Sequence, residues 1–260
     1  MTGTLSDIVF QVEGVSKRFG GLQALSDVGI HIERGQVYGL IGPNGAGKTT
    51  FFNVLTGLYT PDSGTFELAG KTYTPSAVHK VAKAGIARTF QNIRLFAEMT
   101  ALENVMVGRH IRTKSGLIGA VLRTPGFKAE EAAIAKRAYE LLEYVGIAKY
   151  AEFKARTLSY GDQRRLEIAR ALATDPQLIA LDEPAAGMNA TEKVQLRELI
   201  NQIRNDKRTI LLIEHDVKLV MGLCDRVTVL DYGKQIAEGA PTDVQKNEKV
   251  ITAYLGTGSK

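Results

Sequence analysis

Residues 42 to 50, GPNGAGKTT, have the composition and spacing of a loop that binds phosphate. The eight residues from Gly42 to Thr49 match G-x-x-x-x-G-K-[ST] at every specified position. Glycines let backbone N–H groups turn inward around phosphate oxygens, and a helix after the loop adds the positive end of its dipole. We expect Lys48 to reach the β- and γ-phosphates, Thr49 to bind Mg²⁺, and Thr50 to donate to a neighbouring phosphate.

Two acidic residues follow a second apolar run, in LIALDEP. Such a run predicts a strand buried in a parallel sheet, and ligands of these sheets collect at the carboxyl ends of the strands. Asp182 is then suited to hold Mg²⁺, and Glu183 to polarise an attacking water as a general base. The alternative is a solvated corner between strand and loop, which the phosphate loop upstream disfavours.

His215 and Gln91 complete a set of residues suited to hydrolysis. His215 follows the apolar run TILLIE, so it is expected at the same sheet edge, where it could contact the γ-phosphate and hold Glu183 and the water. Gln91, in RTFQN, could sense Mg²⁺ or the water. Taken alone, the histidine could simply cap the next segment and the glutamine could be a loop residue without function. Their combination with the two motifs above favours catalysis.

A second stretch, LSYGDQRRLEIARALA at residues 158 to 173, also has the form of an anion site. A capped helix explains Ser159 at the N-cap and Asp162 three residues later. It does not explain Gly161, because glycine costs a helix roughly 1 kcal/mol relative to alanine. The glycine indicates that a group approaches the backbone closely, and a helix N-terminus suits a phosphate. Because the first loop already holds a phosphate, this second site is expected to serve a nucleotide bound elsewhere.

The elements around these motifs indicate an α/β fold. QVYGLIG predicts a strand that enters the loop, and KTTFFNVLTG a helix that ends at Gly57. QLIALDEP and RTILLIEHD predict buried strands joined by an amphipathic helix, which is a βαβ unit. Residues 6–40 predict a small antiparallel element, and PDSGTFELAG a turn and a strand.

Residues 76–157 differ in character because three of their segments have helical spacing. We therefore expect a single domain over residues 1–260, in which 1–91 and 158–260 form the core with a β subdomain and 92–157 form a helical subdomain.

The composition is that of a globular protein with a mild positive charge. The 260 residues are 44% apolar and 23% charged, with a net charge of +5. This balance permits an anionic ligand without demanding nucleic acid. The single cysteine, Cys224, cannot form an internal disulfide. The N-terminus lacks the pattern of a secretory signal, and no apolar run reaches about 18 residues, so a membrane role is expected to need a partner.

Five motifs in order resemble those of the ATP-binding cassette (ABC) ATPases, over nearly the whole chain. They are Walker A at Gly42–Thr49, the Q-loop at Gln91, the signature LSYGDQ, Walker B in LIALDE, and the switch histidine His215. The resemblance implies a P-loop NTPase core with an antiparallel β subdomain and an inserted helical subdomain. It also implies hydrolysis of ATP with Mg²⁺, catalysed with Glu183, His215, Gln91 and Lys48, and metal binding by Thr49, Gln91 and Asp182.

In this family two cassettes pair head to tail, so the resemblance implies that Ser159 and Gly161 contact the γ-phosphate held by the partner's Walker A. Phe19 in SKRFGG matches the aromatic residue that stacks on adenine, a core aromatic being the alternative. The implied nucleotide-binding residues are Phe19, Gly42, Pro43, Asn44, Gly45, Ala46, Gly47, Lys48, Thr49, Thr50, Ser159 and Gly161. Two departures stand out: Tyr160 replaces the first signature glycine, and Asn189 replaces the aspartate of the D-loop, here AAGMN.

A narrower resemblance is to the longer of the two ATP-binding subunits of bacterial branched-chain amino-acid importers. It is carried by RTFQNIRLFAEMTALENVMVGRH, LSYGDQRRLEIARAL, LDEPAAGMN, LLIEHDVKLVMGLCDRV and the ending VITAYLG. Residues 108–128 resemble an insertion of that subunit. The implied partners are a second ATPase subunit, identical or sister, two transmembrane permeases and, indirectly, a periplasmic substrate-binding protein. The implied location is the cytoplasmic face of the inner membrane.

Three alternatives remain open: an ATPase of lipopolysaccharide export, a soluble cassette ATPase acting on nucleic acid or ribosomes, and an inactive module that senses ATP. Lys48, Asp182, Glu183 and His215 argue against the last. A separate hypothesis concerns residues 104–129, whose basic side chains could face anionic headgroups or the permease, a solvated loop being the alternative. These side chains are Arg109, Arg112, Lys114, Arg123 and Lys128.

Overall fold

A computed structural model describes residues 7–112 and 124–255 of the chain. The chain folds as two compact units. The first comprises residues 1–88, 177–186 and 194–260, and the second comprises 89–176 and 187–193. Within the described residues, no helix is long and apolar enough to cross a membrane.

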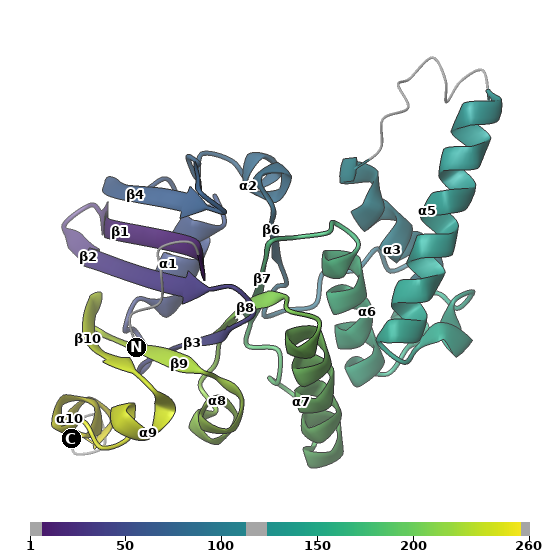
Figure 1. The fold of residues 1–260 in the computed structure, drawn as a ribbon. Helices are drawn as coiled ribbons and strands as arrows, with labels where there is room; N and C mark the ends of the chain where they lie inside the picture. Colours follow the sequence, from purple (N-terminus) through teal and green to yellow (C-terminus); the bar gives the residue numbers. More distant parts are fainter. Residues whose placement is uncertain (1–6, 113–123, 256–260) are drawn as a thin grey trace. The chain divides into compact units, whose positions relative to one another are not determined.

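A six-stranded sheet carries the phosphate loop and the acidic motif in the first unit (Figure 1). Its order is β10-β9-β3-β8-β7-β6, and only β10 runs antiparallel to its neighbour. Every residue of β3, β7 and β8 is buried, which confirms the predicted buried strands and the βαβ unit. The strands are β3 (Val37–Ile41), β6 (Ile86–Arg88), β7 (Leu178–Asp182), β8 (Thr209–Ile213), β9 (Arg226–Asp231) and β10 (Lys234–Gly239).

A second, antiparallel sheet of order β2-β1-β4-β5 also belongs to the first unit. Helix α1 (Lys48–Leu55) lies between the two sheets, as Figure 1 shows, and its Phe51 and Phe52 are buried in a core shared with both. The predicted antiparallel element is therefore confirmed. Its strands are β1 (Ile8–Phe19), β2 (Leu22–Glu33), β4 (Ser63–Leu68) and β5 (Lys71–Thr72).

Further helices complete the first unit. They are α2 (Val78–Ala84), most of α7 (Ala190–Asn205), α8 (Val217–Leu223), α9 (Pro241–Val244) and α10 (Glu248–Leu255). Sequence reasoning assigned no elements after residue 216, and it overlooked β9, whose buried run RVTVLD carries a recognisable strand signal. In contrast, β10 is only half-buried and the last helices are short. Such segments lack the strong periodicity that identifies an element.

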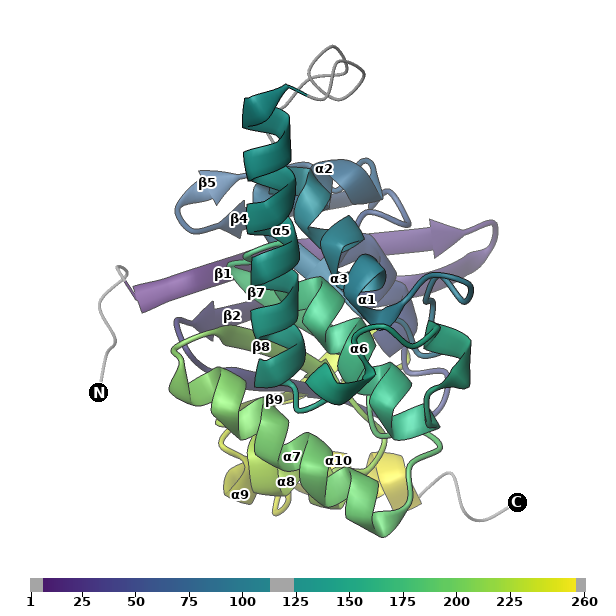
Figure 2. The same cartoon turned by 90° about the vertical axis from the view of Figure 1, so that its right-hand side faces the viewer.

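Three helices pack together in the second unit: α3 (Ala101–Arg109), α5 (Pro125–Tyr144) and α6 (Tyr160–Leu172) (Figure 2). Thr100 and Glu103 form a capping box at the start of α3, and Thr124 caps α5 ahead of Pro125. Short 3₁₀ turns follow α3 and precede α6, at His110–Arg112, Ala148–Tyr150 and Ala155–Thr157.

The boundary of this unit differs from the expected one. We expected residues 158–260 to belong with the core, whereas α6 groups with the helical segments because it packs against α3 and α5. An apolar stripe in a sequence predicts that a helix is half-buried, but it does not identify the element that covers it.

Candidate functional site

The phosphate loop connects β3 to α1, as its sequence predicts. Gly42 has a φ of 153°, and a Cβ added there would overlap the carbonyl oxygen of Leu230. Gly47 precedes the helix with a φ of 101°, and an added Cβ would come within 2.9 Å of the oxygen of Ala24. Both positions therefore require glycine, because a side chain would clash and this backbone conformation disfavours one.

Lys48 begins α1, and its side chain is buried in the loop. Its Nζ donates to the carbonyl oxygens of Gly42 at 2.6 Å and Pro43 at 2.9 Å. Burial lowers the pKa of Lys48, while the charge of Glu183 acts in the opposite direction. A partly buried cation at the N-terminus of a helix creates a site where an anion is favoured.

A cavity of about 350 Å³ opens over the loop. Phe19, a residue that is 42% exposed, borders it, and its ring meets that of Tyr59 edge-on at 5.2 Å between centroids. Sequence reasoning missed Tyr232, which also lines the cavity and is highly exposed. The full lining is Phe19, Leu22, Gln23, Ala24, Asn44, Gly45, Ala46, Gly47, Lys48, Thr49, Thr50, Glu183, Tyr232 and Gly233.

Glu183 follows the last residue of β7 and reaches the same cavity. Its φ is 43°, a left-handed conformation that costs a residue with a side chain about 1–3 kcal/mol. Its Oε2 lies 3.6 Å from Nδ1 of His215, which follows the neighbouring strand β8. The register places these two strand ends side by side, since Asp182 pairs with Ile213. The structure thus brings together Lys48, Glu183 and His215 at one sheet edge.

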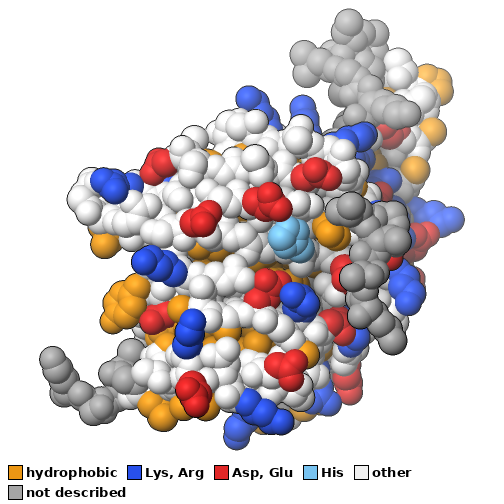
Figure 3. Space-filling view, turned by 60° about the vertical axis from the view of Figure 1, so that its left-hand side comes forward, with side chains coloured by type: hydrophobic (Ala, Val, Ile, Leu, Met, Phe, Trp, Pro, Cys, Tyr) orange, Lys and Arg blue, Asp and Glu red, His pale blue; other side chains and the backbone are white. Residues whose placement is uncertain are grey.

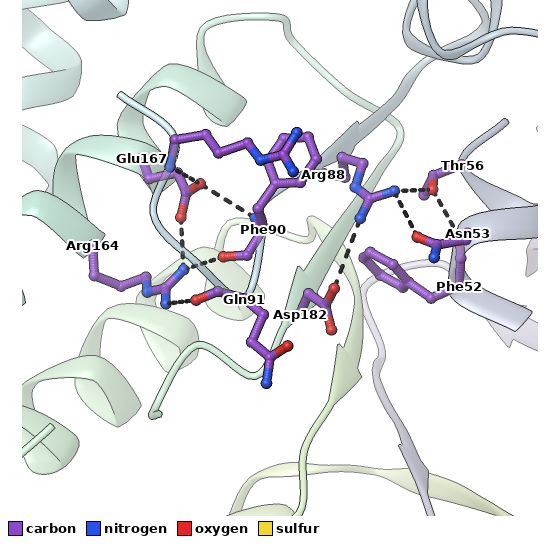
Figure 4. A network of polar contacts seen from close by, with 10 residues as sticks. Phe52, Asn53, Thr56, Arg88, Phe90, Gln91, Arg164, Glu167 and Asp182 are labelled. Carbon is purple, nitrogen blue, oxygen red and sulfur yellow. Dashed lines mark hydrogen bonds and ion pairs between the residues drawn. The ribbon is translucent and has the colours of Figure 1, made fainter. Parts of the chain in front are cut away.

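Asp182 is buried beside an arginine that sequence reasoning missed (Figure 4). Nη2 of Arg88 lies 3.7 Å from Oδ2 of Asp182, and both side chains are nearly inaccessible to solvent. Arg88 also donates to Asn53 at 3.2 Å and to Thr56 at 2.6 Å, and its guanidinium lies 4.7 Å from the ring centroid of Phe52. The arginine anchors the acidic motif to α1, and only its position three residues before Gln91 could have drawn attention to it.

A second buried carboxylate supports the loop after Glu183. Glu214 is fully buried and accepts hydrogen bonds from the backbone N–H groups of Ala185 at 2.9 Å and His215 at 3.2 Å. Burial raises the pKa of Glu214, although these hydrogen bonds act against the rise. The residue ties the segment after β7 to the end of β8.

Gln91, Ser159 and Gly161 belong to the second unit. The hydroxyl of Ser159 accepts from the N–H of Asp162 at 3.2 Å and donates to its carboxylate at 2.7 Å, as the expected N-cap requires. A Cβ added to Gly161 would lie 2.8 Å from Oε1 of Glu192. The group that approaches Gly161 in the described chain is therefore a carboxylate of the same unit, and the glycine does not by itself demand a phosphate.

The asparagine at the D-loop position has a structural explanation. The side chain of Asn189 accepts from the N–H of Glu192 at 3.0 Å, and the carboxylate of Glu192 accepts from the N–H of Asn189 at 2.9 Å. The pair forms a reciprocal cap at the start of α7.

Two of the basic residues between 104 and 129 are engaged within the second unit. Arg109 forms an ion pair with Asp175, and Arg112 donates to the carbonyl oxygens of Thr174 and Asp175. Lys114 and Arg123 lie outside the described residues.

Comparison with known proteins identifies several close matches. A family model described as ABC transporter matches residues 25–186, and one described as branched-chain amino acid ATP-binding cassette transporter matches residues 234–260. The high-affinity branched-chain amino acid transport ATP-binding protein LivG of Salmonella typhimurium is 46% identical over 97% of this chain and 99% of its own length. The lipopolysaccharide export system ATP-binding protein LptB of Haemophilus influenzae is 33% identical over 95% and 97%.

Solved structures of ATP-binding cassettes share the fold. The ADP conformation of MJ1267, an ATP-binding cassette of an ABC transporter, has a TM-score of 0.83 and 32% identity, covering 96% of this chain and 99% of that one. The dimeric structure of MJ0796, a bacterial ABC transporter cassette, has a TM-score of 0.75 and 25% identity, covering 89% and 98%.

Proposed function

The chain belongs to the ABC transporter family as an ATP-binding subunit with ATPase activity, and from this premise we propose that it energises the uptake of branched-chain amino acids. One observation carries the proposal: the likeness to LivG extends over almost the whole length of both chains. The family model for the C-terminal residues 234–260 supports the same assignment independently of the ATPase motifs.

We propose that ATP occupies the cavity over the phosphate loop. Its phosphates would meet the loop backbone and Lys48, and its adenine would stack on the exposed ring of Phe19. Mg²⁺ would be held by the hydroxyl of Thr49 and the carboxylate of Asp182 in the first unit, with the amide oxygen of Gln91 proposed as a third ligand, since hard oxygen ligands are those that Mg²⁺ prefers. When bound, Mg²⁺ supplies charge stabilisation to the β- and γ-phosphate oxygens.

Hydrolysis is assigned to the residues at the sheet edge. Glu183 accepts a proton from the attacking water, and His215, 3.6 Å away, holds the glutamate and contacts the γ-phosphate. Lys48 stabilises the negative charge that spreads over the γ-phosphate oxygens in the transition state. The left-handed backbone of Glu183 supports this assignment, because such conformations concentrate at functional sites.

The N-terminus of α6 would complete the site of a second ATPase subunit, identical or sister, in a head-to-tail dimer. Ser159 and Gly161 would contact the γ-phosphate that the partner's loop holds. Because Glu192 occupies the space beside Gly161, the glycine has two explanations, and a double variant separates them.

We expect Gly161→Ala to lower ATPase turnover at least about tenfold, and Glu192→Ala not to restore it. Overpacking against Glu192 costs about 1–3 kcal/mol of stability, which removal of that side chain should relieve. Turnover should stay low, because the added methyl group would still meet the partner's nucleotide. Denaturant midpoints and ATPase rates of both single variants and the double variant measure this. Recovery of turnover in the double variant would assign the glycine to Glu192 alone.

We propose that the partners are two transmembrane permeases, contacted by the helical unit, and indirectly a periplasmic substrate-binding protein. With these partners, the chain would lie at the cytoplasmic face of the inner membrane. We expect the complex, reconstituted in liposomes, to couple ATP hydrolysis to uptake of leucine, isoleucine or valine. The assay measures radiolabelled uptake and phosphate release with the loaded binding protein outside the vesicle. A rate of ATP hydrolysis that does not depend on these amino acids would contradict the proposed cargo.

The two rival functions are less well supported. LptB is 33% identical to the chain, compared with 46% for LivG. A nucleic-acid surface is expected to gather Lys and Arg on one face. Figure 3 shows basic and acidic side chains interspersed on one face of the first unit, so this face does not favour that alternative.

A further inference from the structure

Tyr160 packs on the backbone of the D-loop segment within the second unit. A Cβ added to Gly187 would lie 3.3 Å from Cε1 of the Tyr160 ring and 3.6 Å from its hydroxyl oxygen. The aromatic ring therefore occupies the space beside Gly187, whose φ of 76° also favours glycine. Gly187 lies two residues before Asn189, so the ring supports the segment that leads into the cap of α7.

Arg164, one turn further along α6, connects this ring to the segment around Gln91. Its Nη2 donates to the hydroxyl of Tyr160 at 3.3 Å and to the carbonyl oxygen of Gln91 at 2.7 Å. Its Nη1 donates to the carbonyl oxygen of Phe90 at 2.6 Å. The planar guanidinium thus holds two successive peptide groups at once, a geometry that a lysine cannot reproduce.

Glu167 completes the arrangement from the next turn of the helix (Figure 4). Its Oε2 accepts from Nη1 of Arg164 at 2.7 Å, and its Oε1 accepts from the N–H groups of Phe90 at 3.2 Å and Arg94 at 3.4 Å. The side chains of Arg164 and Glu167 are 0% and 1% exposed. Both charges are buried, and their hydrogen bonds go to each other, to Tyr160 and to the backbone of residues 90–94.

A fully buried ion pair is weak support for stability, because apolar residues of similar volume often stabilise a protein as well or better. Its best-attested use is to impose a single register on the elements that it joins. Here the pair joins the helix that begins at Ser159 to the peptide of Gln91. Through Tyr160 the same helix turn contacts Gly187, so three motif segments meet on a short stretch of α6.

We propose that Tyr160, Arg164 and Glu167 are positioning residues that hold Gln91 and the segment 187–189 on the first two turns of α6, as one body. Ser159 and Gly161 lie in the first turn of the same helix, so a movement of α6 on contact of its N-terminus with a nucleotide would carry Gln91 and residues 187–189 with it. Tyr160 in place of the signature glycine is then part of this connection. The effect on catalysis and coupling rests on the proposed function, whereas the rigid connection itself does not.

A nitroxide label tests the connection directly. Asn92 is exposed and adjacent to Gln91, and Cys224, the one native cysteine, is buried, so an Asn92→Cys variant of the full chain can be labelled selectively. We expect Arg164→Lys to increase the label's mobility in electron paramagnetic resonance spectra. Arg165→Lys is the matched control, since Arg165 donates to Val145 instead.

A second variant, Arg164→Met with Glu167→Met, tests the connection in case Arg164→Lys unfolds the protein. It removes the ion pair without leaving a buried charge unpaired. It should also mobilise the label while keeping a cooperative unfolding transition. For the D-loop, a label at Met188→Cys should gain mobility in Tyr160→Ala and less in Tyr160→Phe. Unchanged mobility in folded variants, or equal mobility in Arg165→Lys, would overturn the proposal.

The catalytic consequence has its own readout. We expect Arg164→Lys to lower kcat for ATP about tenfold with KM changed less than about twofold, because the site for ATP stays intact while Gln91 is misplaced. Equal losses in Arg165→Lys would assign the effect to general destabilisation and overturn the positioning role. If the labels respond as expected but the wild-type chain with its partners has no ATPase activity, the proposed function fails and the connection stands.

Discussion

Glu183→Gln is expected to bind ATP with near-normal affinity and to lose ATPase turnover by about 10²–10⁴-fold, the contribution of a positioned general base. The amide has the shape of the carboxylate, so the left-handed backbone at residue 183 and the lining of the cavity are retained. It cannot accept a proton from water at neutral pH, so the chemical step fails after binding. Two cassettes that close on ATP should then stay closed, and a dimer should accumulate.

The measurement combines nucleotide binding, phosphate release and gel filtration with ATP and Mg²⁺. Glu214→Gln is the matched control, because Glu214 is also a carboxylate near this sheet edge but is buried against backbone N–H groups. It should lose no more than a few-fold in turnover, provided that its unfolding midpoint shows a folded protein. Near-normal turnover in Glu183→Gln would remove Glu183 from the role of base, and equal losses in both variants would make the loss a packing effect.

Much of the site's geometry could be predicted because it follows from short, local sequence patterns. The loop from Gly42 to Thr49 needs its glycines for backbone reasons that any sequence carrying the pattern shares. Glu183 and His215 follow apolar runs, and the rule that ligands gather at the carboxyl ends of parallel strands predicts their proximity. In the structure, Oε2 of Glu183 lies 3.6 Å from Nδ1 of His215. Local sequence patterns were therefore enough to predict that these side chains lie close together.

The partners that support the site could not be predicted in the same way. Arg88 and Asp182 are 94 residues apart in the chain and meet only because β6 and β7 are neighbours in the sheet. Arg164 and Glu167 have helical spacing, which predicts an ordinary surface ion pair. Their burial follows from the path of residues 90–94 along α6, which no local pattern specifies.

Gly161 illustrates how a correct observation led to an incomplete inference. Its position in a helix indicates that a group approaches the backbone, and this is what the structure shows. A nucleotide was the expected group, whereas the described chain places Glu192 there. A glycine in a helix indicates that another group lies close to the backbone at that position. Which group this is depends on tertiary packing. The same limit applies to Tyr160, whose contact with Gly187 explains a residue that only a departure from a motif had singled out.

Lys48→Ala is expected to weaken ATP binding at least about tenfold and to lower turnover by about 10²–10³-fold, the loss typical of removing one donor from a transition-state site. The wild-type ammonium donates to the carbonyl oxygens of Gly42 and Pro43, so its removal also leaves two acceptors of the loop without this donor. In contrast to Glu183→Gln, this variant should fail at binding as well as at chemistry. No dimer should therefore accumulate with ATP.

The two variants together test whether one cavity performs both steps, because they predict opposite behaviour with ATP. Fluorescent-nucleotide titration and gel filtration of both proteins, beside Lys83→Ala as a control for loss of one positive charge, measure the contrast. Lys83 is exposed on α2, so its removal should change neither affinity nor turnover by more than about twofold. Wild-type ATP affinity in Lys48→Ala would mean that the cavity over the loop is not where the phosphates bind. A trapped dimer in both variants would mean that two cassettes close on ATP without any contact between this lysine and the phosphates.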